Sequence, residues 1–285
     1  HDKGFTTPNT SRMFMTNYDA ADPNITLNDG DSSWGSQMMI EITTSNGYAH
    51  GAGTVKRIDA HLLETIPQTD WRRKCFIDPE LDELVAEAQT VEELNKIVAD
   101  YLSDVSSYPE TITSTAQASA SGAFGGLSLK FRLGGGDAGH SNAQFVGFVV
   151  AVPLMRVEEM KLIEAEAAGM QDEGRGKTLL EAFAKTRDPQ YTYNDLQSFR
   201  DNVWWQRRVE LWGEGFATFD IKRFEKGITR SYAGTNHPKG YRWNTDGVPD
   251  WMNLCIVGTE VNFNQACTNN PTPIQPTEDS PEKVW

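Results

Sequence analysis

The sequence contains no apolar run long enough to span a lipid bilayer and no excess of basic residues. Its longest apolar stretch, FVGFVVAVPLM at 145–155, is interrupted by Pro153 and falls short of the roughly 18 residues that a membrane-spanning helix needs. A buried strand fits this stretch better. The 26 Lys and Arg residues are outnumbered by 40 Asp and Glu residues, so the net charge is -14. This balance argues against nucleic acid as a partner, because phosphates require a basic surface.

Cysteine is also scarce, because the chain has only three such residues. This number excludes a small fold held together by disulfides. Cys255 and Cys267 lie 12 positions apart in a loop-like tail, where they either form a disulfide in an oxidising compartment or remain free thiols. The sequence leaves both possibilities open. If Cys255 and Cys267 pair, Cys75 is left over.

The usual signatures of metal sites and catalytic sites are absent. The five histidines are scattered, without the spacing of a zinc motif. The segment DPNITLNDGD (22–31) is rich in oxygen ligands for calcium, but it lacks the EF-hand spacing, so an Asx-rich turn is the preferred interpretation. No phosphate loop and no nucleophile elbow occurs. We therefore expect no cofactor and no metal.

The chain instead shows helical patterns across its middle. The first part, residues 1–53, is polar and predicts loops around one or two strands. Thr90 and Glu93 have the spacing of a capping box. Alternating apolar residues predict a strand at 127–133, followed by a hairpin that ends near 152. Predicted helices cover 54–66, 153–168 with Gly169 as its cap, 176–187, 194–212 and 216–226, and the tail 229–285 is irregular.

The segment WWQRRVELWGEGFATFDIKRFEKGI (204–228) concentrates aromatic and charged residues. If it is helical, an apolar stripe forms at Trp205, Val209, Trp212 and Phe216. Tryptophan in such a stripe more often belongs to the core than to a ligand site. The pairs Arg207–Glu210 and Asp220–Arg223 are each spaced one helical turn apart, so we expect them to meet.

The glutamates of the helix predicted at 153–168 have two possible roles. A glycoside hydrolase would need two carboxylates, for example Glu159 and Glu166. Arg156 lies one turn before Glu159 and would lower the pKa of that carboxyl group, which favours structural ion pairs. We predict five buried structural residues, and Arg208→Ala should cost on the order of 3–5 kcal/mol. These five residues are Trp205, Trp212, Arg208, Glu159 and Glu166.

Several segments together resemble the carboxyl-terminal half of the SusD/RagB family. They are VKRIDAHLLETIPQTDWRRKCF (55–76), LSLKFRL (127–133), VPLMRVEEMKLIEAEAAG (152–169), RDPQY (187–191) and QRRVELWGEGFATFDIKRFEKGI (206–228). Members of this family are nutrient-binding lipoproteins of the outer membrane of Bacteroidetes. The order and spacing of these segments in the chain resemble those of the family over about 55–230.

The resemblance implies a mainly α fold, with a helical body of the SusD type, a small β-hairpin and long irregular loops. The chain 1–285 would form the carboxyl-terminal domain, with a ligand-facing segment (1–53), a helical body (54–228) and an irregular tail (229–285). The family's tetratricopeptide-like amino-terminal helices and its lipidated cysteine are not visible in this chain.

The resemblance also implies a function, which is non-enzymatic binding of an extracellular oligosaccharide or polysaccharide at the outer surface of the outer membrane. The glycan would then pass to a TonB-dependent SusC-like transporter. A peptide ligand within the same family is an alternative, and a glycoside hydrolase using Glu159 or Glu166 is a more distant one. Incubation with glycans and detection of new reducing ends separates a hydrolase from a binder.

Candidate glycan contacts are aromatic residues outside the helical stripes, in loops with polar neighbours. Trp34 and Tyr48 meet these criteria in the first part of the chain, and HPKGYRWNTDG (237–247) is the second choice. The alternative for Trp34 is that its ring only anchors a loop on the helical body. The predicted binding residues are Trp34, Tyr48, Asp31, Gln37, Asn46, Tyr241 and Trp243.

Overall fold

The computed structural model describes residues 10–16, 57–76, 152–270 and 276–285, together with positions 90, 92, 93, 96 and 130. The chain divides into two compact units. The first unit comprises 1–58 and 62–210, and the second comprises 59–61 and 211–285. Each unit is described by itself below.

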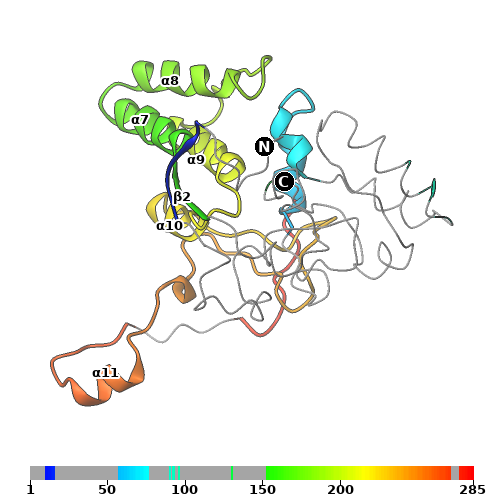
Figure 1. Cartoon of the computed structure of the whole chain (residues 1–285). Coiled ribbons are helices and arrows are strands. Elements are labelled where there is room, and N and C mark those ends of the chain that lie inside the picture. Colours follow the sequence, from blue (N-terminus) through cyan, green and yellow to red (C-terminus); the bar gives the residue numbers. More distant parts are fainter. Residues whose placement is uncertain are drawn as a thin grey trace, which may run out of the picture. The chain divides into compact units, whose positions relative to one another are not determined.

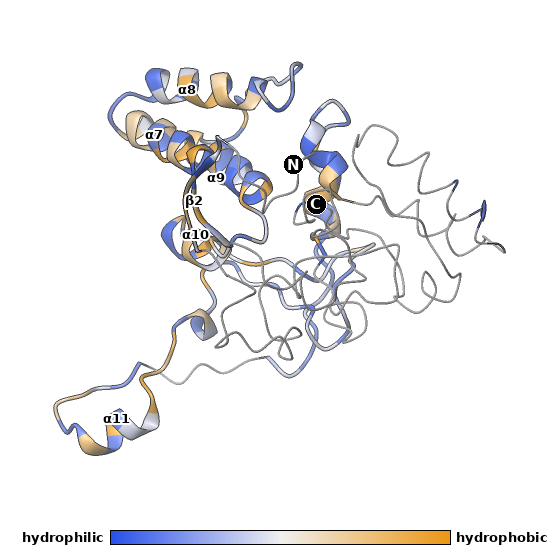
Figure 2. Ribbon diagram, viewed as in Figure 1, coloured by the Kyte–Doolittle hydropathy of each residue, from blue (hydrophilic) through white to orange (hydrophobic). Residues whose placement is uncertain are grey.

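Helices dominate the described part of the first unit. The helices α7, α8 and α9 pack on one another (Figure 1). Leu162, Leu180 and Val203 lie at the centre of this packing and are fully buried. Each of these helices carries both hydrophobic and hydrophilic residues (Figure 2), as expected when one face is packed. The elements are α3 (Ala60–Glu64), the 3-10 helix η2 (Trp71–Cys75), α7 (Val157–Gln171), α8 (Glu173–Lys185) and α9 (Phe199–Glu210).

Side-chain caps explain where several helices begin. Asp172 accepts a hydrogen bond from the backbone N–H of Arg175 at the start of α8. Ser198 accepts one from the N–H of Asp201 at the start of α9, so this helix begins later than the predicted position 194. The predicted capping box is confirmed, because Glu93 N–H donates to Thr90 Oγ1 at 3.1 Å and Thr90 N–H donates to Glu93 at 3.2 Å.

Two glycines allow α7 and α8 to approach closely. A Cβ on Gly176 of α8 would lie 2.4 Å from the Cα of Gly169 in α7, and a Cβ on Gly169 would lie 2.1 Å from the ring of Phe199. Gly169 therefore lies inside α7, and the prediction that it caps the helix is wrong. The absence of a side chain serves helix packing there, and α7 continues to Gln171.

A two-stranded antiparallel sheet joins distant parts of the first unit. Strand β1 (Arg12–Thr16) pairs with β2 (Val152–Arg156), with Arg12 opposite Arg156 and Thr16 opposite Val152. Pro153 therefore lies in a strand, and the prediction that it begins a helix is wrong. Proline has no backbone N–H to donate, but both strands of a two-stranded sheet are edge strands, where proline is tolerated. Most of the hairpin predicted at 127–152 lies outside the described residues.

The fold class predicted from the sequence is confirmed, because the described structure is mostly helical with a small antiparallel sheet. The predicted helices exist, but their ends differ by several residues, since local patterns define helix ends poorly. The helix predicted at 54–66 is described only as α3. The prediction 176–187 corresponds to α8, 194–212 to α9, and 216–226 to α10 (Ala217–Arg223).

The second unit consists mainly of loops around a small core. It contains α10, the 3-10 helix η4 (Asp250–Met252) and α11 (Gly258–Phe263). The chain after α10 pairs with a later segment through an antiparallel bridge between Thr229 and Asn244. Its buried apolar residues are Leu211, Phe224, Ile228, Tyr232 and Trp243.

The described part of the chain includes no helix with the length and apolar character needed to cross a bilayer. All three cysteines are free thiols, with Cys75 buried, Cys255 exposed and Cys267 half-buried. This outcome corresponds to one of the two possibilities that the sequence left open.

The close approach of α7 and α8 predicts that Gly176→Ala destabilises the protein. The new methyl group would meet the backbone of Gly169, and overpacking of this kind costs roughly 1–3 kcal/mol. Denaturant unfolding should therefore show a lower midpoint. Gly174→Ala in the same helix is the control, because its nearest neighbour lies at 3.3 Å and alanine favours the helix by up to about 1 kcal/mol. Equal midpoints for Gly176→Ala and the parent would contradict this account.

Candidate functional site

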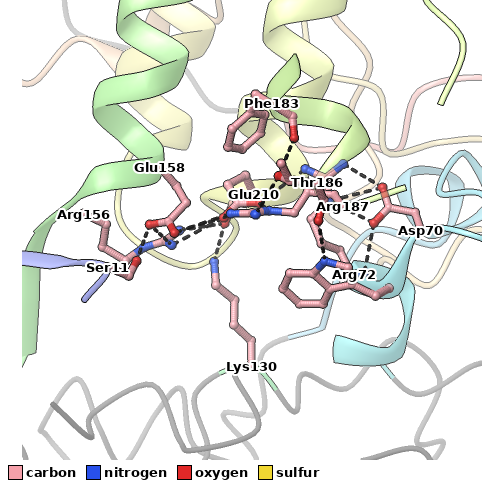
Figure 3. Close-up of polar contacts among 11 residues, drawn as sticks. Ser11, Asp70, Arg72, Lys130, Arg156, Glu158, Phe183, Thr186, Arg187 and Glu210 are labelled. Carbon is pink, nitrogen blue, oxygen red and sulfur yellow. Dashed lines mark hydrogen bonds and ion pairs between the residues drawn. The ribbon is translucent and has the colours of Figure 1, made fainter. Parts of the chain in front are cut away.

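The most heavily paired carboxylate among the described residues belongs to Glu210, the last residue of α9 (Figure 3). Its residue surface is only 2% exposed. Arg187 binds it with two hydrogen bonds, from Nε to Oε2 at 3.1 Å and from Nη2 to Oε1 at 3.2 Å. Arg72 reaches Oε2 at 3.4 Å, and Arg156 reaches Oε1 at 3.4 Å. Three arginines therefore surround one buried acid.

These arginines come from three separate segments of the first unit. Arg72 lies on η2, Arg156 ends β2, and Arg187 follows α8. Asp70 holds Arg72 in place, because it caps η2 through the N–H of Arg72 at 2.9 Å and binds its guanidinium at 2.7 Å. The carboxylate of Glu210 thus connects segments that are more than a hundred positions apart in the sequence.

Further contacts fix the orientation of Arg187. Its guanidinium lies over the ring of Trp71 at 5.5 Å and over the ring of Phe183 at 4.8 Å, distances typical of cation–π contacts. Its carbonyl accepts a hydrogen bond from the N–H of Trp71 at 3.1 Å. The Arg187 side chain is therefore held on both faces while it binds Glu210.

Two additional groups complete the cluster. Glu158 binds Arg156 at 3.0 Å and accepts a hydrogen bond from Ser11 Oγ. Lys130 is buried, and its Nζ donates to the backbone carbonyl of Glu210 at 2.7 Å. The alternating pattern at 127–133 placed Lys130 on the polar face of a strand, and this burial corrects that interpretation.

The charges decide the protonation state of this cluster. Burial alone would raise the pKa of Glu210, but the positive charges of Arg187 and Arg72, with Arg156, outweigh it and hold that pKa well below its usual range. For Arg72, burial acts in the opposite direction and lowers the pKa, but its contacts with Asp70 and Glu210 produce a net increase. An acid that is always ionised and sealed from solvent cannot transfer protons to a substrate. We conclude that the cluster is structural.

The five residues predicted to be buried are only partly buried. Trp205 donates from Nε1 to Thr65 Oγ1 at 2.8 Å, and Arg208 lies over the ring of Trp204 at 4.7 Å. Trp212, Glu159 and Glu166 are half-buried as well. The predicted stripe fails because α9 ends at Glu210, so that Trp212 and Phe216 lie beyond it. The buried polar residues of α9 are Asn202, Gln206, Arg207 and Glu210.

Two ion pairs were predicted from one-turn spacing, Arg207–Glu210 and Asp220–Arg223. The partners observed for the carboxylate of Glu210 are Arg72, Arg156 and Arg187, all remote in the sequence. The prediction for the other pair is confirmed, because Arg223 binds Asp220 at 2.9 Å in α10.

The candidate ligand site is an aromatic group in the second unit, formed by Tyr241, Trp243 and Trp251, which we call the aromatic ledge. The ring centroids of Tyr241 and Trp243 are 5.7 Å apart, and those of Trp243 and Trp251 are 5.5 Å apart. Trp243 is only 5% exposed, whereas Tyr241 is 56% exposed. Tyr241 therefore presents ring surface to solvent, while the buried ring of Trp243 packs against it at an angle of 48°.

Backbone hydrogen bonds hold the loop that carries the aromatic ledge. The carboxylate of Asp279 accepts from the N–H groups of Gly240 and Arg242, each at 2.9 Å. These two bonds lower the pKa of Asp279, so it stays ionised at neutral pH. Gly240 has a φ of 85°, a conformation that favours glycine. The position of Tyr241 is thus fixed on both sides.

A polar cluster in the second unit centres on Asp59. Its Oδ2 accepts a hydrogen bond from the hydroxyl of Tyr232 at 2.7 Å and contacts His237 Nε2 at 3.1 Å. Burial, with a further contribution from Asp59, raises the pKa of Tyr232 to about 12. The hydroxyl therefore stays protonated and acts as a donor. His61 stacks on Trp285 with ring centroids 4.1 Å apart.

The structure places only part of the predicted binding site. Tyr241 and Trp243 are adjacent, but the buried Trp243 cannot offer a ring face to a sugar. Trp251 and Arg230, which lies 5.8 Å from the ring of Trp243, were missed. Trp251 lies two positions after Pro249 in the tail predicted to be irregular and met the same sequence criteria, although the structure places it in η4. No local pattern pointed to Arg230. Outside the described residues lie Trp34, Tyr48, Asp31, Gln37 and Asn46.

Within the described ranges, no group of three or more His, Cys, Asp or Glu residues has an arrangement suited to a metal ion. The oxygen-rich segment 22–31 lies outside those ranges.

Comparison with known proteins gives a consistent result. Residues 67–275 match the model of the SusD family. A SusD-like carbohydrate binding protein from Bacteroides vulgatus ATCC 8482 has a similar structure, with 18% identity, a TM-score of 0.56, and coverage of 93% of this chain and 50% of that chain. A SusD superfamily protein from Bacteroides thetaiotaomicron VPI-5482 is also similar, with 16% identity and a TM-score of 0.53. This match covers 92% of this chain and 49% of that chain.

This chain therefore spans about half the length of the solved structures it resembles. No curated protein matches it significantly in sequence.

The Glu210 cluster predicts how stability depends on pH. The pKa of the Glu210 carboxyl group is depressed from an ordinary 4.5. Its contribution to the stability of the fold is therefore complete above pH 4.5 and is lost as the pH falls below that value. Glu210→Gln should cost on the order of 3–5 kcal/mol at neutral pH, because it removes the buried negative charge that three arginines share. The stability gap between the parent and the variant should shrink on acidification below pH 4.5, as measured by denaturant unfolding.

The exposed Glu164 on α7 provides the control, and Glu164→Gln should change stability by less than about 1 kcal/mol. A gap between the parent and Glu210→Gln that stays constant between neutral pH and strongly acidic pH would show that Glu210 does not make this contribution.

Proposed function

Because the chain belongs to the SusD family, we propose that it binds an extracellular oligosaccharide or polysaccharide without cleaving it. The observation that carries this proposal is the family match over residues 67–275. A structural relative described as a carbohydrate-binding protein supports the choice of ligand.

The aromatic ledge offers a physical basis for glycan binding. Sugars bind proteins by stacking their C–H faces on exposed aromatic rings while polar groups bind their hydroxyls. Tyr241 is exposed, and the buried Trp243 supports its ring. A ring that is already held in place loses little entropy when a ligand binds. We therefore assign the stacking contact to Tyr241 and a supporting role to Trp243.

The first segment of the chain supplies a second proposed set of contacts. Trp34 and Tyr48 are proposed to stack on the glycan, with hydroxyl contacts from Asp31, Gln37 and Asn46. Their selection depends on their residue types, on their polar surroundings, and on the family resemblance.

The family resemblance extends the proposal to location and partner. We propose that the whole protein is held at the outer surface of the outer membrane by a lipid anchor. There it passes its glycan to a TonB-dependent SusC-like transporter. A peptide ligand is the alternative within the same family.

A glycoside hydrolase using Glu159 and Glu166 is less well supported. Both residues lie on α7, and seven residues along one helix separate their Cα atoms, and not necessarily their carboxyl groups, by about 10.5 Å. Hydrolases place their two carboxyl groups at most roughly 9.5 Å apart, on opposite sides of the scissile bond. Two acids on the same helix do not flank a bond in this way.

Loss of the Tyr241 ring should weaken glycan binding. Aromatic contacts of this type contribute about 0.5–1.5 kcal/mol, so Tyr241→Ala should raise the Kd roughly 2- to 10-fold. Calorimetry with a glycan selected on an array measures this change. Phe219→Ala is the matched control, because Phe219 is an aromatic residue of α10 that is more exposed than Tyr241, at 72% against 56%. Equal affinity of Tyr241→Ala and the parent would remove Tyr241 from the site.

Trp34→Ala tests the second set of contacts. If Trp34 stacks on the glycan, the substitution should raise the Kd several-fold and leave the melting temperature unchanged. If Trp34 only anchors a loop, the melting temperature should fall and the affinity should not change. The second result would exclude Trp34 from the site.

A further inference from the structure

Among the described residues, the guanidinium of Arg230 forms no hydrogen bond or ion pair. Its backbone N–H is fixed by Asn244 Oδ1 at 2.9 Å and by the carbonyl of Trp243 at 3.2 Å. Its guanidinium lies 5.8 Å from the ring centroid of Trp243. The residue is half-buried, so part of its hydration is lost, and no acidic side chain of the described residues forms an ion pair with it.

Asp59 interacts with this charge only at a distance. Asp59 raises the pKa of Arg230 only through its field, and burial produces a net decrease. The Oδ2 atom of Asp59 is occupied by the hydroxyl of Tyr232 and by His237. A partly desolvated charge is unfavourable until an anion compensates it. The site around Arg230 thus favours an anionic group from outside the chain.

Arg230 also adjoins the proposed glycan contact. The guanidinium of Arg230 and the ring of Tyr241 both lie within 6 Å of the ring of Trp243, at 5.8 Å and 5.7 Å. A short oligosaccharide stacked on Tyr241 would therefore lie close to a planar fork of N–H donors. Such a fork matches the geometry of a carboxylate or a sulfate, often through two parallel hydrogen bonds.

The net charge of -14 opposes anionic ligands in general, but it does not decide the local interaction. Charges farther away than about 8 Å are largely screened at physiological ionic strength. Lys239 and Arg242 lie in the same segment as Tyr241. The local surroundings of the aromatic ledge therefore include several positive groups.

We propose that Arg230 binds the anionic group of an acidic sugar, a carboxylate or a sulfate, while a ring of the same glycan stacks on Tyr241. This inference rests on the proposed function and narrows its substrate class from glycans in general to acidic glycans. Trp243 links the two parts of the site, because it supports both the aromatic ring and the guanidinium.

The test is an array that carries oligogalacturonides, their neutral methyl esters, sulfated oligosaccharides and neutral oligosaccharides. The parent protein should retain an acidic class and bind the neutral methyl esters at least about tenfold more weakly, as expected when a charge-assisted hydrogen bond is lost. The carboxylate and sulfate arms show which anion is preferred. Arg230→Gln should lose the same factor on the acidic class, and Arg230→Lys should retain part of it.

Lys239→Gln is the matched control, because it removes one positive charge from the same segment but leaves the guanidinium over Trp243. Its affinity for the acidic class should fall far less than that of Arg230→Gln, because Lys239 contributes only to the field around the aromatic ledge. Melting temperatures establish that the variants are folded, and if Arg230→Gln is not, the parent's preference for acidic over esterified probes decides the question.

Binding restricted to neutral oligosaccharides, or acidic binding that Arg230→Gln leaves unchanged, would overturn this inference and leave the proposed function in place. Absence of binding to every class would contradict the proposed function itself.

Discussion

The buried carboxylate of Glu210 is the interaction on which the described part of the first unit depends. Arg72, Arg156 and Arg187 approach it from η2, from β2 and from the turn after α8. Removing an acid from water is costly unless opposite charges and hydrogen bonds compensate it. The segments that supply the arginines must therefore reach their positions together. This requirement favours a single arrangement of η2, β2, α8 and α9.

The sequence predicts the local part of this structure well. The capping box of Thr90 and Glu93 and the pair of Asp220 and Arg223 depend only on neighbours within one turn, and both are present. The non-local part was not accessible in the same way. Glu210 has its partners up to 138 positions away, and Gly169 is required by the approach of another helix. No periodicity records such contacts, so Gly169 and Pro153 were misassigned.

The candidate site shows the same division. Residue type and polar surroundings identified Tyr241 and Trp243, but only the structure shows that Tyr241 is exposed and Trp243 is buried. Arg230 lies near Trp243 because residues 228–230 pair with 243–245 through the bridge of Thr229 and Asn244. The guanidinium of Arg230 and the exposed ring of Tyr241 thus both lie within 6 Å of the ring of Trp243. A stacking surface with a nearby cation is suited to holding a ligand.

The central claim is that this chain binds glycans and does not cleave them. The most direct measurement incubates the purified protein with a set of oligosaccharides and follows bound ligand and new reducing ends in the same samples. The account predicts saturable binding with no increase in reducing ends over the protein-free control. Reducing ends that accumulate in proportion to the protein concentration would contradict it.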